Sequence, residues 1–257
     1  MLDLSIDILS PRSLRATEEG RELLRLWLAL LPEYTPEYCG NTEPVKHPFN
    51  PRDLDGALAY WQCPFLATRR RPPRMQASVW MDIGPKRQHA AFGLSLRSED
   101  TNPFALRKFL GAMTSHLRAD FAEAHVLGPV DIERGQQAGS VEPLNKNRTR
   151  FMLMVSTRRL QRYLGDLYWA TVFGPPYVDL IGRERLLSAP AHESAALEYG
   201  GVYVQVTRDM LDPKRRPAEF EETRQRVKTH LDNNIFFDPD APATHVYQAP
   251  EFRFEPE

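Results

Sequence analysis

The segment from Tyr168 to Ala191 reads YWATVFGPPYVDLIGRERLLSAPA and holds the clearest structural pattern of the chain. Its first part is aromatic and β-branched, which is typical of a buried strand. A Gly-Pro-Pro sequence at 174–176 ends this run, because prolines fix the backbone and remove hydrogen-bond donors. The next residues have helical spacing, but a glycine such as Gly182 costs about 1 kcal/mol in a helix interior relative to alanine. We therefore predict a strand, a turn and a helix that breaks at Gly182.

The sequence on both sides of this segment alternates between strand and helix patterns. RFMLMV at 150–155 predicts a buried strand, and GGVYVQVTRD at 200–209 predicts another after a tight turn. PAEFEETRQRVKTHL at 217–231 predicts a helix, since apolar residues such as Phe220 and Leu231 recur at helical spacing. The C-terminal part of the chain thus combines strands with helices.

The N-terminal part repeats this combination. Residues 2–8 alternate between aliphatic and polar side chains, which predicts a first strand, and a helix then runs to Pro32. Two further strands are predicted at 76–84 and 89–98, with a loop around Gly84-Pro85. Asn102-Pro103 then begins a helix with a strong apolar face.

These elements predict an α+β fold in which mixed sheets are flanked by helices. Both parts of the chain run through strand, helix, further strands and a long helix, which suggests two similar α+β halves. We place the N-terminal half at 1–130 and the C-terminal half at 150–257. The Gly- and Gln-containing stretch at 131–149 is interpreted as a linker or long loop.

Composition excludes several classes of protein. The 257 residues are 42% hydrophobic and 26% charged with a net charge of −1, which is ordinary for a globular protein and does not indicate nucleic acid or membrane. No apolar run reaches the length of a membrane span, and the N-terminus lacks the pattern of a secretory signal. We expect a cytoplasmic protein with two free thiols, Cys39 and Cys63, although a disulfide between them is the alternative.

The sequence lacks the common catalytic motifs. No phosphate-binding glycine loop, nucleophile elbow or paired-cysteine zinc motif is present. His192-Glu193 begins like a zinc-protease motif, but the second histidine is missing. Glu43 and Lys46 have the wrong spacing for a metal nuclease. We expect a protein that is not an enzyme and binds no cofactor and no metal.

Two segments carry opposite charge. Residues 64–91 hold six basic residues against one aspartate, and the centre of this run is RRRPPR at 69–74. We interpret it as a solvated basic loop or a surface for an acidic partner. Residues 232–257 hold six acids against one arginine, together with several aromatic residues. They form either a solvated tail or an ordered acidic segment that enters a basic groove of a partner.

Candidate partner contacts follow from these charges. The Arg-Glu-Arg triplet at 183–185 cannot be wholly buried, so at least one of its members is expected at a surface. The full set of candidates is Arg183, Glu184, Arg185, Glu193, Asp238, Asp240, Tyr247, Glu251 and Phe252.

The string VFGPPYVDLIGRERLLSAPA at 172–191, followed by YGGVYVQVTRDMLD at 199–212, resembles the bacterial immunity protein 52 family. The segment from 36 to 81 also has the look of that family. The most specific block runs from Gly174 to Pro190. We interpret as a structural motif Trp169, which precedes this block, together with Gly174, Pro175, Pro176, Tyr177 and Gly182 within it.

The resemblance implies an immunity protein that neutralises a cognate toxin. Members of this family are antidotes encoded beside polymorphic or type VI secreted toxins, and the expected toxin is a nuclease of restriction-endonuclease-like fold. An acidic face could plug the basic active site, or the protein could bind elsewhere and block substrate entry or toxin assembly. The toxin is the expected partner, with no membrane and no direct nucleic acid.

Two other functions stay open at this point. One is an enzyme in which His192 and Glu193, or Asp179 and Glu184, converge in a cleft. The other is a nucleic-acid-binding module that uses the arginines at 69–74.

Overall fold

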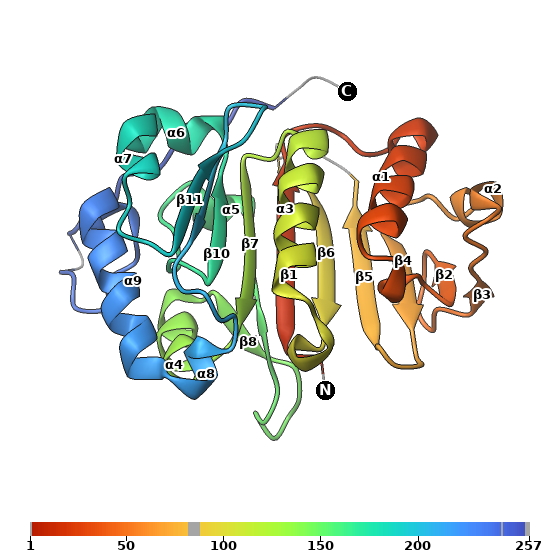
Figure 1. Cartoon of the computed structure of the whole chain (residues 1–257), viewed down its shortest axis with the longest axis horizontal. Coiled ribbons are helices and arrows are strands. Elements are labelled where there is room, and N and C mark those ends of the chain that lie inside the picture. The colour runs from red at the N-terminus through yellow and green to blue at the C-terminus, as the bar shows by residue number, and fades with distance from the viewer. Residues whose placement is uncertain (1, 82–87, 243, 255–257) are drawn as a thin grey trace. The chain divides into compact units, whose positions relative to one another are not determined.

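The computed structural model describes residues 2–81, 88–242 and 244–254. The chain divides into two compact units, of which the first comprises 1–122 with 253–257 and the second comprises 123–252. Each unit combines β-strands with α-helices (Figure 1), so the predicted α+β class is confirmed. The division between the units falls inside strand β7 (Phe121–Val126).

The first unit holds antiparallel strands in the order β1-β6-β5-β4-β2-β3. Their bounds are β1 (Leu4–Ser10), β2 (Tyr38–Gly40), β3 (His47–Pro48), β4 (Phe65–Arg69), β5 (Met75–Trp80) and β6 (Ala90–Leu96). The predicted first strand is β1, whose alternate residues Leu4, Ile6 and Ile8 are buried. The other two predicted strands are β5 and β6, and the loop expected around Gly84-Pro85 lies outside the described residues.

Two long helices of the first unit lie on one face of these strands (Figure 1). The helices of this unit are α1 (Thr17–Leu30), α2 (Leu54–Leu58) and α3 (Pro103–Leu117), with 3₁₀ turns η1 (Pro32–Tyr34) and η2 (Ser98–Asp100). Helix α1 turns Leu23, Leu24 and Trp27 into the core, where the Trp27 ring meets Phe92 edge-on at 5.6 Å. Asn102 caps α3 by accepting the backbone N–H of Phe104 at 2.9 Å.

The second unit holds strands in the order β11-β12-β10-β7 and a separate hairpin, β8–β9. The strand bounds are β8 (Val141–Pro143), β9 (Phe151–Leu153), β10 (Ala170–Phe173), β11 (Glu193–Ala196) and β12 (Val202–Gln205). The predicted buried strand at 150–155 is the short β9, in which Leu153 is buried but Met152 is exposed. Only one face of this strand packs on the unit, since the hairpin has two strands and an open outer face.

The helices of the second unit are α4 (Pro129–Ala138), α5 (Thr157–Leu160), α6 (Pro175–Ile181), α7 (Arg183–Leu187), α8 (Asp212–Arg215) and α9 (Pro217–Leu231), with a 3₁₀ turn η3 (Asn233–Ile235). Residues 131–149, interpreted above as a linker, contain most of α4 and all of β8. Pro129 at the helix start and Gly139 with a φ of 69° at its end bound α4. Pro129 and Gly139 thus favour a helix here, although the composition suggests a loop.

The segment 168–191 folds as strand β10, helix α6 and helix α7. The predicted break at Gly182 is confirmed, with a φ of 95° between the two helices. Gly174 has a φ of −75°, which residues other than glycine also adopt. Pro175 and Pro176 occupy the first turn of α6, where a missing N–H costs no hydrogen bond.

In the part of the chain that the structure describes, none of the helices is both long enough and apolar enough to cross a membrane.

Candidate functional site

The acidic segment after α9 is tied to the second unit by backbone hydrogen bonds. Leu164 donates its N–H to the carbonyl of Ile235 at 2.8 Å, and Phe237 donates its N–H to the carbonyl of Leu164 at 2.8 Å. Phe236, between these two bonds, is buried. This part of the acidic segment is therefore ordered against its own unit.

Aromatic rings hold the next part of the segment. The Tyr163 ring lies 5.2 Å from the ring of Phe237 and 5.1 Å from that of Tyr247, and His245 meets Tyr247 edge-on at 4.5 Å. The Tyr247 hydroxyl donates to the carbonyl of Asp238 at 3.1 Å. Tyr247, a candidate partner contact, thus holds the loop that carries the aspartates, whose described residues 237–242 and 244–247 we call the acidic loop.

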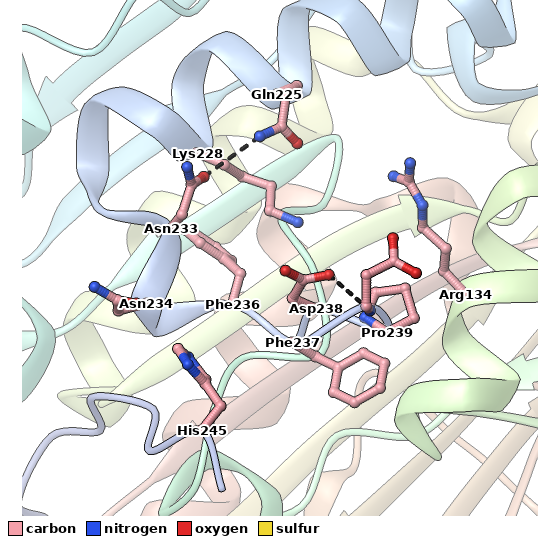
Figure 2. Close-up of a pocket in the computed structure, with 11 residues that line it drawn as sticks. Arg134, Gln225, Lys228, Asn233, Asn234, Phe236, Phe237, Asp238, Pro239 and His245 are labelled. Carbon is pink, nitrogen blue, oxygen red and sulfur yellow. Dashed lines mark hydrogen bonds between the residues drawn. The ribbon is translucent and has the colours of Figure 1, made fainter. Parts of the chain in front are cut away.

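A pocket of about 320 Å³ lies between this loop, α9 and α4. Figure 2 shows the ammonium group of Lys228 and the carboxylate of Asp238 facing the same space. The lining residues are Arg134, Gln225, Lys228, Asn233, Asn234, Phe236, Phe237, Asp238, Pro239, Asp240 and His245. Two of the predicted contact residues, Asp238 and Asp240, therefore lie together at a concave surface.

The cations of the pocket already pair with acidic residues that lie outside its lining. Lys228 donates its Nζ to Asp166 at 2.9 Å, and Arg134 pairs with Glu221. Burial alone would raise the pKa of Asp166, but the charges of Arg224 and Lys228 outweigh burial and hold it below its usual range. Asp166 therefore stays ionised and balances the charge of Lys228.

The two aspartates of the acidic loop have no such balance. Asp238 and Asp240 are exposed, and the Asp238 carboxylate accepts the N–H of Asp240 at 2.9 Å. Within the described ranges, neither carboxylate forms a salt bridge. The mouth of the pocket therefore offers negative charge that forms no salt bridge with any residue the structure describes.

A buried ion-pair network lies behind the pocket. Arg224, only 1% exposed, donates to Asp131 at 2.6 Å, lies 3.5 Å from Asp166 and pairs with Glu221. Burial would raise the pKa of Asp131, but His125 and Arg224 hold it far below its usual range. The network fixes α9 to α4, and thereby fixes the wall from which Lys228 and Gln225 project.

The residues of the 168–191 segment serve mainly as framework. Trp169 is fully buried, and its Nε1 donates to the carbonyl of Thr207 at 2.8 Å. Tyr177 is also buried and meets Phe173 at 5.8 Å and Phe252 at 6.1 Å, both edge-on. Phe252, a candidate partner contact, is therefore engaged with its own chain.

The other candidate contacts lie on several elements of the second unit. Arg183 and Arg185 are exposed on α7 but donate to the carbonyls of Gly200 at 3.2 Å and Leu231 at 3.4 Å. Glu184 is exposed on the same helix. Glu193 begins the terminal strand β11, and Glu251 is exposed near the C-terminus. Asp238, Asp240 and Tyr247 are the candidates that hydrogen bonds bring together.

The basic run at 69–74 lies at the β4–β5 connection of the first unit and is largely held by its own chain. Arg70 donates to the carbonyl of Val45 at 2.9 Å and stacks over Tyr38, while Arg71 pairs with Glu37 at 3.4 Å. Arg69 donates to the carbonyl of Thr35 at 3.3 Å. These contacts hold three of the arginines of the run against their own unit.

The helix at 217–231 was predicted, but its role and that of α4 as walls of the pocket were not. A signal for them was present, because Arg224 and Lys228 fall on the same helical stripe as the buried Phe220 and Leu231. Charged residues on an apolar stripe are buried only when they are paired. The stripe therefore indicates a buried ionic partner on a neighbouring element.

Comparisons with known proteins give a likeness of fold. No protein-family model matches the chain, and no curated protein matches it. Among solved structures, the chain is similar to the Pseudomonas aeruginosa T6SS protein PA0821, with a TM-score of 0.52 and 12% sequence identity. The match covers 88% of this chain and 76% of that chain. The resemblance to the immunity protein 52 family accordingly stays a prediction, while the likeness to the T6SS protein extends over most of the fold.

Proposed function

We propose that this protein is a cytoplasmic immunity protein that binds and neutralises a cognate antibacterial toxin by protein–protein contact, without enzymatic activity of its own. One observation carries the proposal: Asp238 and Asp240 project uncompensated from a loop that is held in place before any partner arrives. A preorganised loop binds more tightly than a mobile one, because less conformational entropy is lost on binding.

The proposed partner surface is basic. A nuclease toxin needs cations to hold its nucleic-acid substrate, so an acidic loop can compete with phosphates for those cations. The resemblance of the 172–191 string to the immunity protein 52 family supports a nuclease as the toxin. The fold likeness to a T6SS protein supports the same biological setting.

The affinity that such a role requires sets the scale of the interface. An antidote must keep nearly all toxin molecules bound, which corresponds to a Kd of about 1 nM or lower, or roughly −12 kcal/mol. Two surface carboxylates cannot supply this alone, so apolar contacts must add to them. Val246 supplies such a contact beside the aspartates, since it is 84% exposed.

The test is co-expression with the product of the neighbouring gene, read out by co-purification and by rescue of growth. We expect a stable complex and rescue with the wild-type chain. Replacing both Asp238 and Asp240 by lysine should weaken the complex by about tenfold or more, because the loop would then face a basic surface with like charge.

The matched control replaces Glu198 and Glu222, two exposed acids of the same unit, by lysine. This control changes the net charge by the same amount and should leave rescue intact. If the wild-type chain neither binds nor protects, the immunity role is wrong. If both pairs of substitutions weaken the complex equally, net charge rather than the acidic loop governs binding.

A further inference from the structure

The β8–β9 hairpin and helix α5, which follows it, form another charged surface of the second unit. Residues 143–165 contain no acidic residue. The basic residues of this stretch are Lys146, Arg148, Arg150, Arg158, Arg159 and Arg162. Among the residues with described positions, no salt bridge involves Lys146, Arg148 or Arg150. We call the stretch 144–152 the basic hairpin.

The turn of the basic hairpin is built by specific hydrogen bonds. Leu144 donates its N–H to the carbonyl of Arg150 at 2.8 Å, and the side-chain oxygen of Asn145 accepts the N–H groups of Thr149 at 3.0 Å and Arg150 at 3.2 Å. The Asn145 amide also donates to the Thr149 hydroxyl at 2.8 Å. In Figure 1 the hairpin projects beyond α4 and α8 of its own unit. Its cations are thus presented to a partner from a defined turn.

The outer face of the hairpin is apolar as well as basic. Val141 pairs with Leu153 across the strands, and both are buried. Because side chains alternate between faces, Met152 and its cross-strand partner Glu142 point to the opposite face, where both are exposed. Leu144, just beyond the end of β8, is 50% exposed, and Met152 is 40% exposed. Exposed methionine and leucine beside arginine are typical of a protein interface, whereas phosphate contacts need no apolar side chain. The outer face therefore favours a protein partner over a nucleic acid.

The acidic loop has the complementary character and lies near the base of the hairpin. The Tyr163 hydroxyl donates to the carbonyl of Ala138 at 3.3 Å, just before β8, while its ring packs on Phe237 and Tyr247. Tyr163 thus lies between the two charged surfaces of the unit. Each surface has exposed apolar residues: Leu144 on one, Val246 on the other.

We propose that the basic hairpin of one copy binds the acidic loop of a second copy, and that the two copies form a two-fold symmetric dimer. In such an interface each copy contributes both surfaces, so every contact occurs twice. The charges are complementary, and the described residues form no salt bridge with Lys146, Arg148, Arg150, Asp238 or Asp240. This self-association is a property of the chain alone and does not depend on the proposed immunity role. If that role holds, the toxin and the second copy compete for the same carboxylates.

The test measures the oligomeric state of the full chain by sedimentation velocity at low and high salt, about 50 mM and about 500 mM NaCl. We expect a dimer at low salt and a shift to monomer at high salt. The triple variant Lys146→Glu, Arg148→Glu, Arg150→Glu should raise the dimer Kd by about tenfold or more, and so should Asp238→Lys with Asp240→Lys.

Two further chains make the result decisive. The variant that carries all five substitutions exchanges the two charges, so it should dimerise about as well as the wild type. Arg208→Glu with Arg226→Glu, at exposed sites of the same unit, should leave the dimer unchanged. A wild-type chain that is monomeric at low salt would overturn the proposal. A dimer that still forms when the three cations of the basic hairpin are replaced would also overturn it. So would a variant with all five substitutions that stays monomeric although circular dichroism shows that it is folded.

Discussion

Arg224 is the residue on which the second unit depends most for its buried charge balance. Its guanidinium contacts Asp131, Asp166 and Glu221 at 1% exposure. Replacement by methionine keeps the apolar stem but removes the buried cation that these three carboxylates share, which should cost about 3–5 kcal/mol of unfolding free energy. Urea unfolding measures this loss.

The control is Arg226→Met on the exposed side of the same helix, which should change stability by no more than about 0.5 kcal/mol. Adding Asp131→Asn to Arg224→Met should recover part of the loss, because one buried charge is then removed with its partner. A loss of equal size for Arg224→Met and Arg226→Met would mean that helix propensity, rather than charge balance, matters here.

The same network predicts acid sensitivity. The pKa values of Asp131 and Asp166 are lowered in the folded state, against the effect of burial, by His125, Arg224 and Lys228. Groups with a lowered folded pKa stabilise the protein fully above their unfolded pKa of about 3.9 and lose this contribution as pH falls through the folded value. We therefore expect the unfolding free energy to fall steeply below about pH 4.

The variant Asp166→Asn should flatten this acid dependence, whereas Asp179→Asn, at an exposed site, should not. The measurement is urea unfolding at pH 7 and at successive lower values. Equal slopes for the wild type and Asp166→Asn would show that Asp166 takes no part in acid unfolding.

At the scale of elements, the α6–α7 junction depends on Gly182. Its φ of 95° is a conformation that side chains with a Cβ rarely adopt, although a Cβ built there meets nothing within 4 Å. Gly182→Ala should therefore cost about 1–3 kcal/mol through backbone strain alone. Gly56→Ala is the matched control, because Gly56 lies in helix α2 with ordinary φ and should gain stability from helix propensity. If both substitutions stabilise the protein, strain at Gly182 is absent.

How far the sequence predicts an element depends on whether its signal is local. The strand–helix–helix order of 168–191 was predictable, because prolines and glycines act on their immediate neighbours. Helix α4 was missed, although Gly128-Pro129 and Gly139 bracket it, because its polar composition resembles a loop. The site was half predictable: local charge identified Asp238 and Asp240. Arg134 and Lys228 join them only through tertiary packing.

At the scale of the whole molecule, each unit has its own core. Both cysteines lie in the first unit, so their reactivity measures how readily that unit opens. Both thiols are free, as predicted. Cys63 is exposed, whereas Cys39 is buried on β2 between β3 and β4, and burial raises the pKa of its thiol. A buried thiol reacts only when the surrounding strands open, so its labelling rate measures the free energy of that opening.

A thiol reagent such as DTNB should therefore react rapidly with one thiol of the native protein, and with the second only as denaturant opens the first unit. The variant Cys63→Ser should lose the rapid phase entirely and retain the slow one, whereas Cys39→Ser should do the reverse. The slow phase should accelerate with urea because opening exposes surface that urea solvates. Two rapid phases in the native wild type would show that β2 separates readily from its neighbouring strands, so that Cys39 is accessible without global unfolding. No rapid phase would show that Cys63 is covered in solution, which is the result expected only if another molecule binds over it.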